Sequence, residues 1–301
     1  MTEKEQEPRL FSLSRIWTIA LNTLTESLRQ KVYLILILFA LVLIASASFF
    51  SQFGLGEPGE QEAMEQLKFM KDFCLGAIAV FGMLIAIVGT AQLLPNELEN
   101  RTIYTILAKP VRRCEFLLGK YVGSALLLLV SVAIMSLMFA AALKFKGDNY
   151  LRLIRGAAGP QESSVEWEQM QRQVERIRAT VYDTDLAKAL LLAYLKLALL
   201  AGITLFVSTF GTSIIFNVAV TVMIFFAGHL VGAAKERWLE SGVAQFLFSL
   251  IPDLGMFNVA DDVILGNAIP WLYVLQVAAY GMVYLVAVLA AAVCVFAERE
   301  V

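Results

Sequence analysis

The side chains that most often carry out catalysis are scarce in this sequence. It has one histidine, His229, and three cysteines that lie far apart, so neither a histidine zinc motif nor a C-x-x-C pair can form. Gly119 and Lys120 match the end of a phosphate-binding loop, but Tyr121 follows them and no glycine precedes them at the required spacing. We therefore expect no catalytic residue, no metal site and no ATP-binding loop on this chain.

One lysine, Lys196, lies inside an otherwise apolar run, LLLAYLKLALLAG. A charge near the middle of a membrane-spanning helix costs at least about 2.5–3.5 kcal/mol, so it needs a partner helix, a backbone carbonyl or water. Lys196 could belong to a transport pathway or to a subunit interface. Alternatively, the helix begins elsewhere and the lysine reaches the headgroups. We interpret His229 as a hydrogen-bonded packing residue.

The composition indicates what holds these residues in place. Hydrophobic residues make up 59% of the 301 residues and charged residues 17%. In soluble domains the hydrophobic fraction is roughly 45–50% and the charged fraction about 25%. The apolar residues also lie in long unbroken runs. The sequence therefore predicts an all-α polytopic integral membrane protein, and its net charge of −2 gives no reason to expect a nucleic-acid partner. The polar, mixed-charge start does not resemble a cleaved signal peptide.

Six runs of about 20 mostly apolar residues are long enough to cross a bilayer. They are residues 32–50, 74–94, 121–143, 186–207, 212–231 and 272–296. Each must be helical, because lipid offers no hydrogen-bond partner to an exposed backbone amide. The link at residues 209–211 is very short, so we expect the fourth and fifth helices to form a tight antiparallel hairpin.

A different kind of helix precedes the first span. In residues 10–30, apolar residues recur every three or four positions, from Leu13 through Trp17 and Leu21 to Leu28, with polar residues between them. This pattern is typical of an amphipathic helix that lies in the membrane surface. The alternative is a core helix of a small soluble domain.

The distribution of basic residues predicts the orientation in the membrane. Arg9, Arg15, Arg29 and Lys31 precede the first span. Five more bases lie in the connection at 95–120, whereas the connection after the first span has only Lys68 and Lys71. By the positive-inside rule, both termini and the 95–120 connection are cytoplasmic, and segments 144–185 and 232–270 are extracytoplasmic. Segment 144–185 also contains basic residues, but acidic residues balance them. In addition, long loops are translocated across the membrane with little dependence on their charge.

The two extracytoplasmic segments are large enough to have structure of their own. Residues 163–181 read as an amphipathic helix. Its buried stripe would be Val174, Ile177 and Val181. In segment 232–270, the apolar run 246–251 is too short to span the membrane and ends at Pro252, so we expect a re-entrant or surface-lying piece.

The 95–120 connection has the pattern of a docking helix. A short helix should start near Glu97 and end near Lys109, because Pro110 disfavours a helical conformation at the residue before it. An amphipathic cytoplasmic helix between two spans is suited to binding a partner. The alternative is a helix that lies on the membrane with its basic side chains in the headgroups.

The same connection resembles the cytoplasmic loop of ABC-2 type transporter permeases. The matching residues are Glu97, Glu99, Arg101, Thr102, Leu107, Lys109, Pro110, Val111, Arg113, Gly119, Lys120 and Tyr121. Residues 22–44 are similar to the branch of these permeases associated with maturation of multicopper enzymes and nitrous oxide reductase. Arg101 is a departure, because the family more often has glycine there.

This resemblance implies a function and partners. The chain would be one ABC-2 type transmembrane domain over residues 1–301, the permease subunit of an ATP-driven exporter in the bacterial cytoplasmic (inner) membrane. A separate ATPase subunit, with its own ATP and Mg²⁺, would dock on the loop at 95–120. The pathway would form between two permeases, this chain and a second copy or a paralogue. Glu97, Glu99 and Arg101 would contact the ATPase or order the loop, and no cofactor is expected on this chain.

Two other classes of function stay open. A membrane scaffold or assembly factor would hold a partner protein with segment 144–185 and transport nothing. An ion-coupled secondary transporter would use Lys196 as its titrating group, although the sequence has no convincing inverted repeat and no acid inside the predicted spans. The substrate cannot be read from the sequence, since Met135 and Met138 are more simply packing residues than copper ligands.

Overall fold

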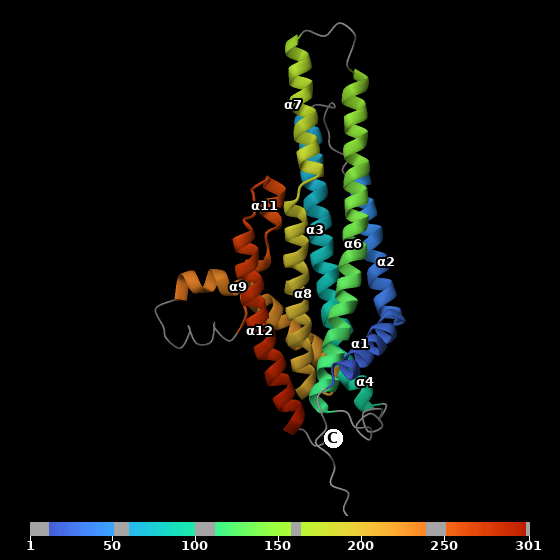
Figure 1. The fold of residues 1–301 in the computed structure, drawn as a ribbon, viewed down its shortest axis with the longest axis vertical. Coiled ribbons are helices and arrows are strands. Elements are labelled where there is room, and N and C mark those ends of the chain that lie inside the picture. The colour runs from blue at the N-terminus through green and yellow to red at the C-terminus, as the bar shows by residue number, and fades with distance from the viewer. Residues whose placement is uncertain (1–11, 51–59, 100–111, 158–163, 239–250, 299–301) are drawn as a thin grey trace, which may run out of the picture.

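The protein is a bundle of long helices, as the composition predicts. The computed structural model describes residues 12–50, 60–99, 112–157, 164–238 and 251–298, and every regular element in these ranges is helical (Figure 1). The elements are α1 (Leu13–Leu28), α2 (Lys31–Phe50), α3 (Glu60–Ala91), α4 (Leu93–Glu99), α6 (Arg113–Ala157), α7 (Ser164–Val181), α8 (Asp185–Phe210), α9 (Ile214–Trp238), the short 3-10 helix η1 (Gly255–Phe257), α11 (Ala260–Leu265) and α12 (Trp271–Glu298).

Six of these helices, α2, α3, α6, α8, α9 and α12, are long and apolar enough to cross a membrane. Each covers all or nearly all of one of the six predicted runs, but two are much longer than their runs. α3 already begins at Glu60, and α6 continues to Ala157. With 45 residues, α6 is about 68 Å long at 1.5 Å per residue, more than twice the roughly 30 Å hydrocarbon core.

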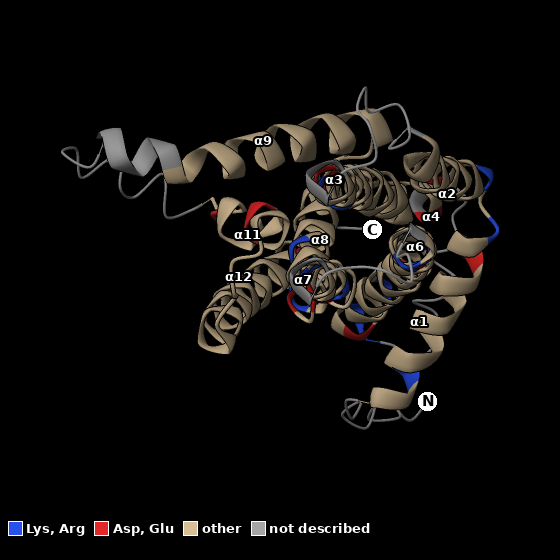
Figure 2. Ribbon diagram, turned by 90° about the horizontal axis from the view of Figure 1, so that it is seen from above, with Lys and Arg blue, Asp and Glu red and all other residues tan. Residues whose placement is uncertain are grey.

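The centre of the bundle is α8. It packs against α3, α6 and α12, which surround it in the view along the bundle (Figure 2). Leu197, Leu200 and Leu205 on α8 are completely buried. Small and hydroxyl side chains on α8 suit this central place, since Gly202 lets Leu285 approach closely and Ser208 donates to the carbonyl oxygen of Ala91 at 3.4 Å.

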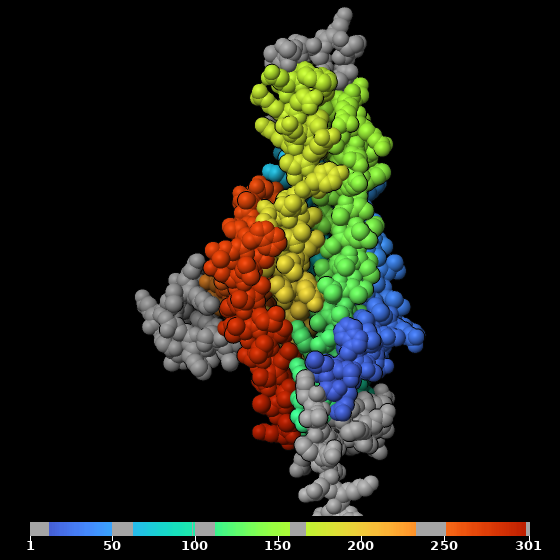
Figure 3. Space-filling view, in the orientation of Figure 1, coloured from blue at the N-terminus to red at the C-terminus, as the bar shows by residue number. Residues whose placement is uncertain are grey.

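The extra length of α3 and α6 forms a projection that we call the stalk: residues 60–73 of α3, residues 144–157 of α6, and α7. It stands above the rest of the bundle in Figures 1 and 3. Val174 and Ile177 on α7 are buried in it, as the sequence pattern predicts. Apolar contact between the three helices thus holds a polar segment in an ordered arrangement.

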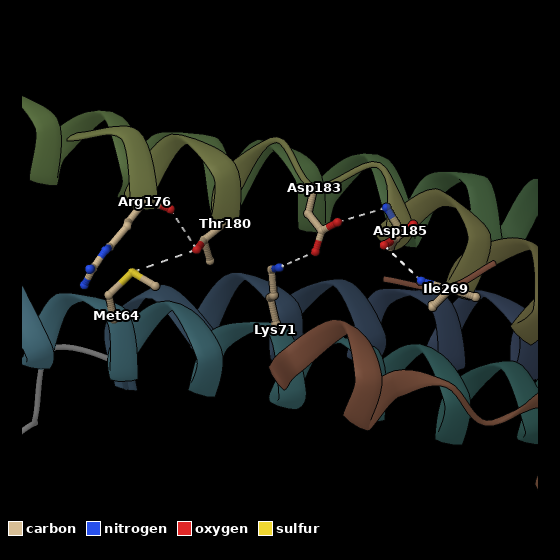
Figure 4. A network of polar contacts seen from close by, with 7 residues as sticks. All are labelled: Met64, Lys71, Arg176, Thr180, Asp183, Asp185 and Ile269. Atoms are coloured by element: carbon tan, nitrogen blue, oxygen red, sulfur yellow. Dashed lines mark hydrogen bonds and ion pairs between the residues drawn. The ribbon is translucent and has the colours of Figure 1, made fainter. Parts of the chain in front are cut away.

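A network of polar contacts joins the stalk to the bundle (Figure 4). The Lys71 ammonium of α3, 2% exposed, donates to Asp183 Oδ2 at 3.0 Å in the turn between α7 and α8. Asp183 Oδ1 accepts the backbone N–H of Asp185 at 2.9 Å, and Asp185 Oδ2 accepts the backbone N–H of Ile269 at 3.2 Å. Three segments far apart in the sequence are therefore fixed to one another at this level.

At the opposite end, which we call the base, α1 packs closely on α6. Two glycines of α6 make this possible: a Cβ at Gly119 would lie 2.7 Å from Ile19 Cβ, and one at Gly123 would lie 2.8 Å from the carbonyl oxygen of Ala20. The first half of the predicted apolar stripe of α1 is exposed, with Leu13 at 75%, Trp17 at 53% and Leu21 at 43%. Leu24 and Leu28, at the end of the stripe, pack against the buried core of the bundle. The exposed half is available to a membrane surface.

The predicted hairpin of α8 and α9 is only partly correct. The link is as short as expected, but α9 crosses the bundle obliquely instead of returning along α8 (Figure 2). Hydrogen bonds to other segments hold α9 near its start and again near residue 228. The Asn217 side chain donates to the carbonyl oxygen of Ala91 at the end of α3 at 3.2 Å, and the carbonyl oxygen of Gly228 accepts the N–H of Leu254 at 3.0 Å.

The glycine contact between α1 and α6 gives a prediction. Gly123→Ala should lower the free energy of unfolding by about 1–3 kcal/mol, because the new methyl group meets a backbone oxygen that cannot rotate away. The measurement is thermal unfolding in detergent, together with the rate at which a protease cleaves α1. Gly76→Ala is the matched control, because a Cβ there meets nothing within 4 Å. Equal stability of the two variants would show that α1 does not depend on this close packing.

Candidate functional site

Charged side chains from three helices meet at the base around Lys120 of α6. Its ammonium is 2% exposed and forms ion pairs with Glu97 of α4 and, at 3.9 Å, with Glu26 of α1. It also lies 5.8 Å from the centre of the Phe116 ring. A buried ammonium needs a counter-charge, so the two carboxylates and the lysine hold α1, α4 and α6 together.

A second acid, Glu115, joins the starts of α1 and α6. It is fully buried and accepts the backbone N–H groups of Ser12 at 2.8 Å and of Arg112 at 3.2 Å, while Arg15 Nη1 lies 3.4 Å from it. Glu115 precedes the predicted span at 121–143. Its carboxylate therefore satisfies backbone donors at two helix N-termini, where negative charge is favoured.

These contacts determine the protonation of Glu115. Burial alone would raise the pKa of this carboxyl, but the two backbone donors and Arg15 outweigh burial and hold the pKa below its usual value. Because the folded-state pKa is lowered, the group stabilises the fold at neutral pH. That contribution is lost as the pH falls from the ordinary glutamate range through the lowered pKa.

Arg113 connects the same region to the last helix. Its guanidinium donates to the carbonyl oxygens of Phe296 at 3.3 Å and Ala297 at 3.0 Å, at the C-terminal end of α12. The Phe116 and Phe296 rings stack with centroids 6.1 Å apart. A cation at a helix C-terminus satisfies carbonyls that have no partner within the helix. We call Glu26, Glu97, Arg113, Glu115 and Lys120 the base cluster; it links α1, α4, α6 and α12.

The structure brings together some of the residues that the loop motif indicates. Glu97, Arg113 and Lys120 belong to the base cluster, and Gly119 lies in the adjoining contact with α1. Glu99, the last residue of α4, is exposed. Arg101, Thr102, Leu107, Lys109 and Pro110 lie outside the described residues. Residues 97–99 of the predicted docking helix belong to α4 (Leu93–Glu99), and the rest of that predicted helix lies outside the described residues.

Sequence reasoning missed Glu26, Glu115 and Arg15. Glu26 and Arg15 are on the amphipathic helix, about 90 positions before α6, and no local pattern relates the two helices. Glu115 carried a weak signal, because an acid in the first turn of a helix is a common capping residue.

Lys196 lies in the middle of the core of the bundle. It is 5% exposed on α8, about 16 Å along the helix from Asp185. Among the described residues, no acceptor lies within hydrogen-bond or ion-pair distance of its ammonium. Its charge and that of Asp253 both act on His229 of α9.

His229 and Asp253 lie at the junction of α9, η1 and α12. His229 is a packing residue as predicted: its Nδ1 lies 3.0 Å from the carbonyl oxygen of Phe225, and the two rings are 4.3 Å apart. Asp253 follows Pro252, is 6% exposed, and accepts the N–H of Gly255 at 3.1 Å. Its own N–H donates to the Tyr280 hydroxyl at 2.8 Å. The connection thus places an acid inside the bundle that no predicted span contains.

A family comparison identifies the class to which this arrangement belongs. The family model described as ABC-2 family transporter protein matches residues 58–292, well over half of the chain. The chain therefore belongs to the ABC-2 transporter family. It is a multi-pass membrane protein and a permease component of an ABC transporter, a class that is generally not itself catalytic. A comparison with individually curated proteins finds no match.

The buried lysine of the base cluster gives the second prediction. Lys120→Met removes the buried ammonium that pairs with Glu97 and Glu26, and should lower the free energy of unfolding by about 3–5 kcal/mol. Glu26→Gln removes only the longer, more exposed contact and should cost less than about 1 kcal/mol.

Thermal unfolding in detergent measures both changes. The double variant Lys120→Met/Glu97→Leu should recover most of the loss, because it removes both buried charges. Additive losses in the double variant would contradict a direct coupling between Lys120 and Glu97.

Proposed function

We propose that this chain is the permease subunit of an ATP-driven ABC-2 exporter. In this proposal a separate ATPase subunit binds ATP and Mg²⁺ and docks on the connection at 95–120. The observation that carries the proposal is the base cluster. In a chain of the ABC-2 family, buried ion pairs and hydrogen bonds tie both ends of this connection to α1, α4, α6 and α12.

The base cluster offers a route by which force could spread from the ATPase. Residues 95–120 include the end of α4 and the start of α6, and the Lys120–Glu97 ion pair joins the two. Glu115 and the contact at Gly119 add α1, and Arg113 adds α12. A displacement of the connection would therefore move four helices together. α6 would carry that movement along its whole length to the stalk.

Within this proposal the two loop glutamates have different roles. Glu97 is engaged inside the protein and acts as a positioning residue for α4. Glu99 is exposed and is the one available to the ATPase. Arg101, Thr102, Leu107, Lys109 and Pro110 would complete the docking surface.

The wider assembly follows the same proposal. The chain works with a second copy of itself or a paralogous permease in a bacterial inner membrane. Both termini and the 95–120 connection face the cytoplasm, as the basic residues around them favour. The branch related to metalloenzyme maturation is supported only by residues 22–44, and the substrate is left open.

The division of roles between Glu97 and Glu99 gives the third prediction. Glu99→Lys should abolish co-purification of the ATPase encoded by a neighbouring gene, and leave the thermal stability of the permease unchanged. Glu97→Lys should lower both, because it also places like charges against Lys120. Glu168→Lys, on the exposed surface of α7, is the matched control and should recruit the ATPase normally.

If the Glu99→Lys variant recruits the ATPase as well as the wild type does, Glu99 is not part of the docking surface. A wild-type chain that recruits no ATPase, even when its genomic neighbours are co-expressed, would overturn the proposed function. It would favour a scaffold that uses the stalk, or an ion-coupled transporter.

We further assign Lys196 to the transport pathway. The protein keeps a buried ammonium without a hydrogen-bond or ion-pair partner among the described residues, which destabilises the fold. In this proposal water, the cargo or the second permease compensates the ammonium during transport.

The assignment gives the fourth prediction. Lys196→Met should raise the free energy of unfolding by about 2–3 kcal/mol, since it removes an uncompensated charge, and should lower transport-coupled ATP turnover in liposomes. Lys188→Met, the same change on the same helix, should destabilise the protein, because Lys188 contacts Asp185 and the carbonyl oxygen of Ile269 at 2.7 Å. Increased stability with normal turnover would show that Lys196 is not a pathway residue.

A further inference from the structure

A basic cleft lies on the stalk, between α6 and α7. It has a volume of about 200 Å³ and is lined by Asp148, Leu151, Arg152, Arg155, Arg178 and Tyr182. Three of the six lining residues are arginines and one is acidic, so the cleft carries net positive charge. The arginines come from two helices that the stalk holds in fixed relation, with Leu151 and Ile177 buried between them.

The three arginines of the cleft have no carboxylate partner among the described residues. This differs from Arg172, on the same helix as Arg178, which pairs with Glu168 at 3.5 Å one turn away. The cleft therefore leaves three guanidinium groups free to bind an external anion. A guanidinium presents paired N–H donors that match the oxygens of a phosphate.

The depth of the cleft in the membrane indicates where that anion comes from. Asp185 and Lys188 mark the start of the apolar part of α8, and the Lys188 ammonium lies 5.0 Å from the centre of the ring of the exposed Trp271. Exposed tryptophan and tyrosine beside charged groups are typical of the membrane–water interface. Tyr182, 60% exposed, lies three residues before Asp185 and lines the cleft. The floor of the cleft is thus at headgroup level.

The surface around the cleft is apolar as well as basic. On α6, Phe145 is 66% exposed and lies one turn before Asp148 on the same face of the helix. A large exposed apolar side chain near arginines is suited to lipid, which offers acyl chains and phosphates together. A soluble anion would use the arginines alone.

We propose that this cleft binds the phosphate headgroup of an anionic lipid in the leaflet on the stalk side. Arg152, Arg155 and Arg178 contact the phosphate oxygens, and Tyr182 lies at the rim beside the glycerol backbone. The bound lipid would join α6 to α7 next to Asp183, which directly follows the cleft residue Tyr182 and pairs with Lys71 (Figure 4). This proposal rests on the stalk alone and holds whether or not an ATPase drives the protein.

Native mass spectrometry of the full chain in detergent tests the proposal. The protein is titrated with phosphatidylglycerol, with phosphatidylcholine of the same acyl chains, and with inorganic phosphate. Wild-type protein should bind phosphatidylglycerol in preference to phosphatidylcholine. Arg178→Gln should weaken phosphatidylglycerol binding about fivefold, as expected for the loss of one basic residue at a headgroup. The triple variant R152Q/R155Q/R178Q should weaken it more than about 20-fold.

Arg172→Gln is the matched control, because it removes the same charge from the same helix outside the cleft, and it should bind like the wild type. Equal losses in Arg172→Gln and Arg178→Gln, or equal binding of the two lipids, would overturn the proposal. Displacement of phosphatidylglycerol by inorganic phosphate, but not by chloride of equal ionic strength, would overturn the lipid as the source of the phosphate. All replaced side chains are exposed, so unchanged thermal unfolding confirms that the variants are folded.

Discussion

The arrangement of this protein depends on how each buried charge is neutralised. A charge removed from water is costly unless an opposite charge or several hydrogen-bond partners replace the water. At the base, Lys120 can be buried only because Glu97 of α4 and Glu26 of α1 reach it. At the stalk, Lys71 can be buried only because Asp183 lies beside it. Each pair joins helices that apolar contact alone would leave free to slide.

The same requirement separates structural charges from the one to which we assign a functional role. Lys71 and Lys120 are as deeply buried as Lys196, yet both have carboxylate partners. Lys196 has none among the described residues and lies in the core of α8. A permease must change conformation to work, and a group left uncompensated in one conformation makes that conformation easier to leave. The paired lysines hold the two ends of the bundle while the unpaired one lies between them.

Mechanical continuity comes from α6, which runs without a break from the base cluster to the stalk. Glycines at 119 and 123 let α1 approach its lower part, and α7 covers its upper part. One rigid helix therefore contacts the interfacial helix at one end and the basic cleft at the other. Events on the two sides of the membrane could reach each other through it, without any chain of small side-chain movements.

Hydropathy alone determined the helical class and the six spanning helices, because lipid permits few ways to satisfy a backbone. The residue motif of the 95–120 connection, through its resemblance to ABC-2 permeases, indicated the family and gave Glu97, Arg113, Gly119 and Lys120, which lie within one short stretch. Only the tertiary structure showed that Glu26 and Glu115 complete the base cluster, that α9 crosses the bundle, and that Asp253 enters it. Those features depend on contacts between segments far apart in the chain, whereas hydropathy and periodicity record only which face of a segment avoids water.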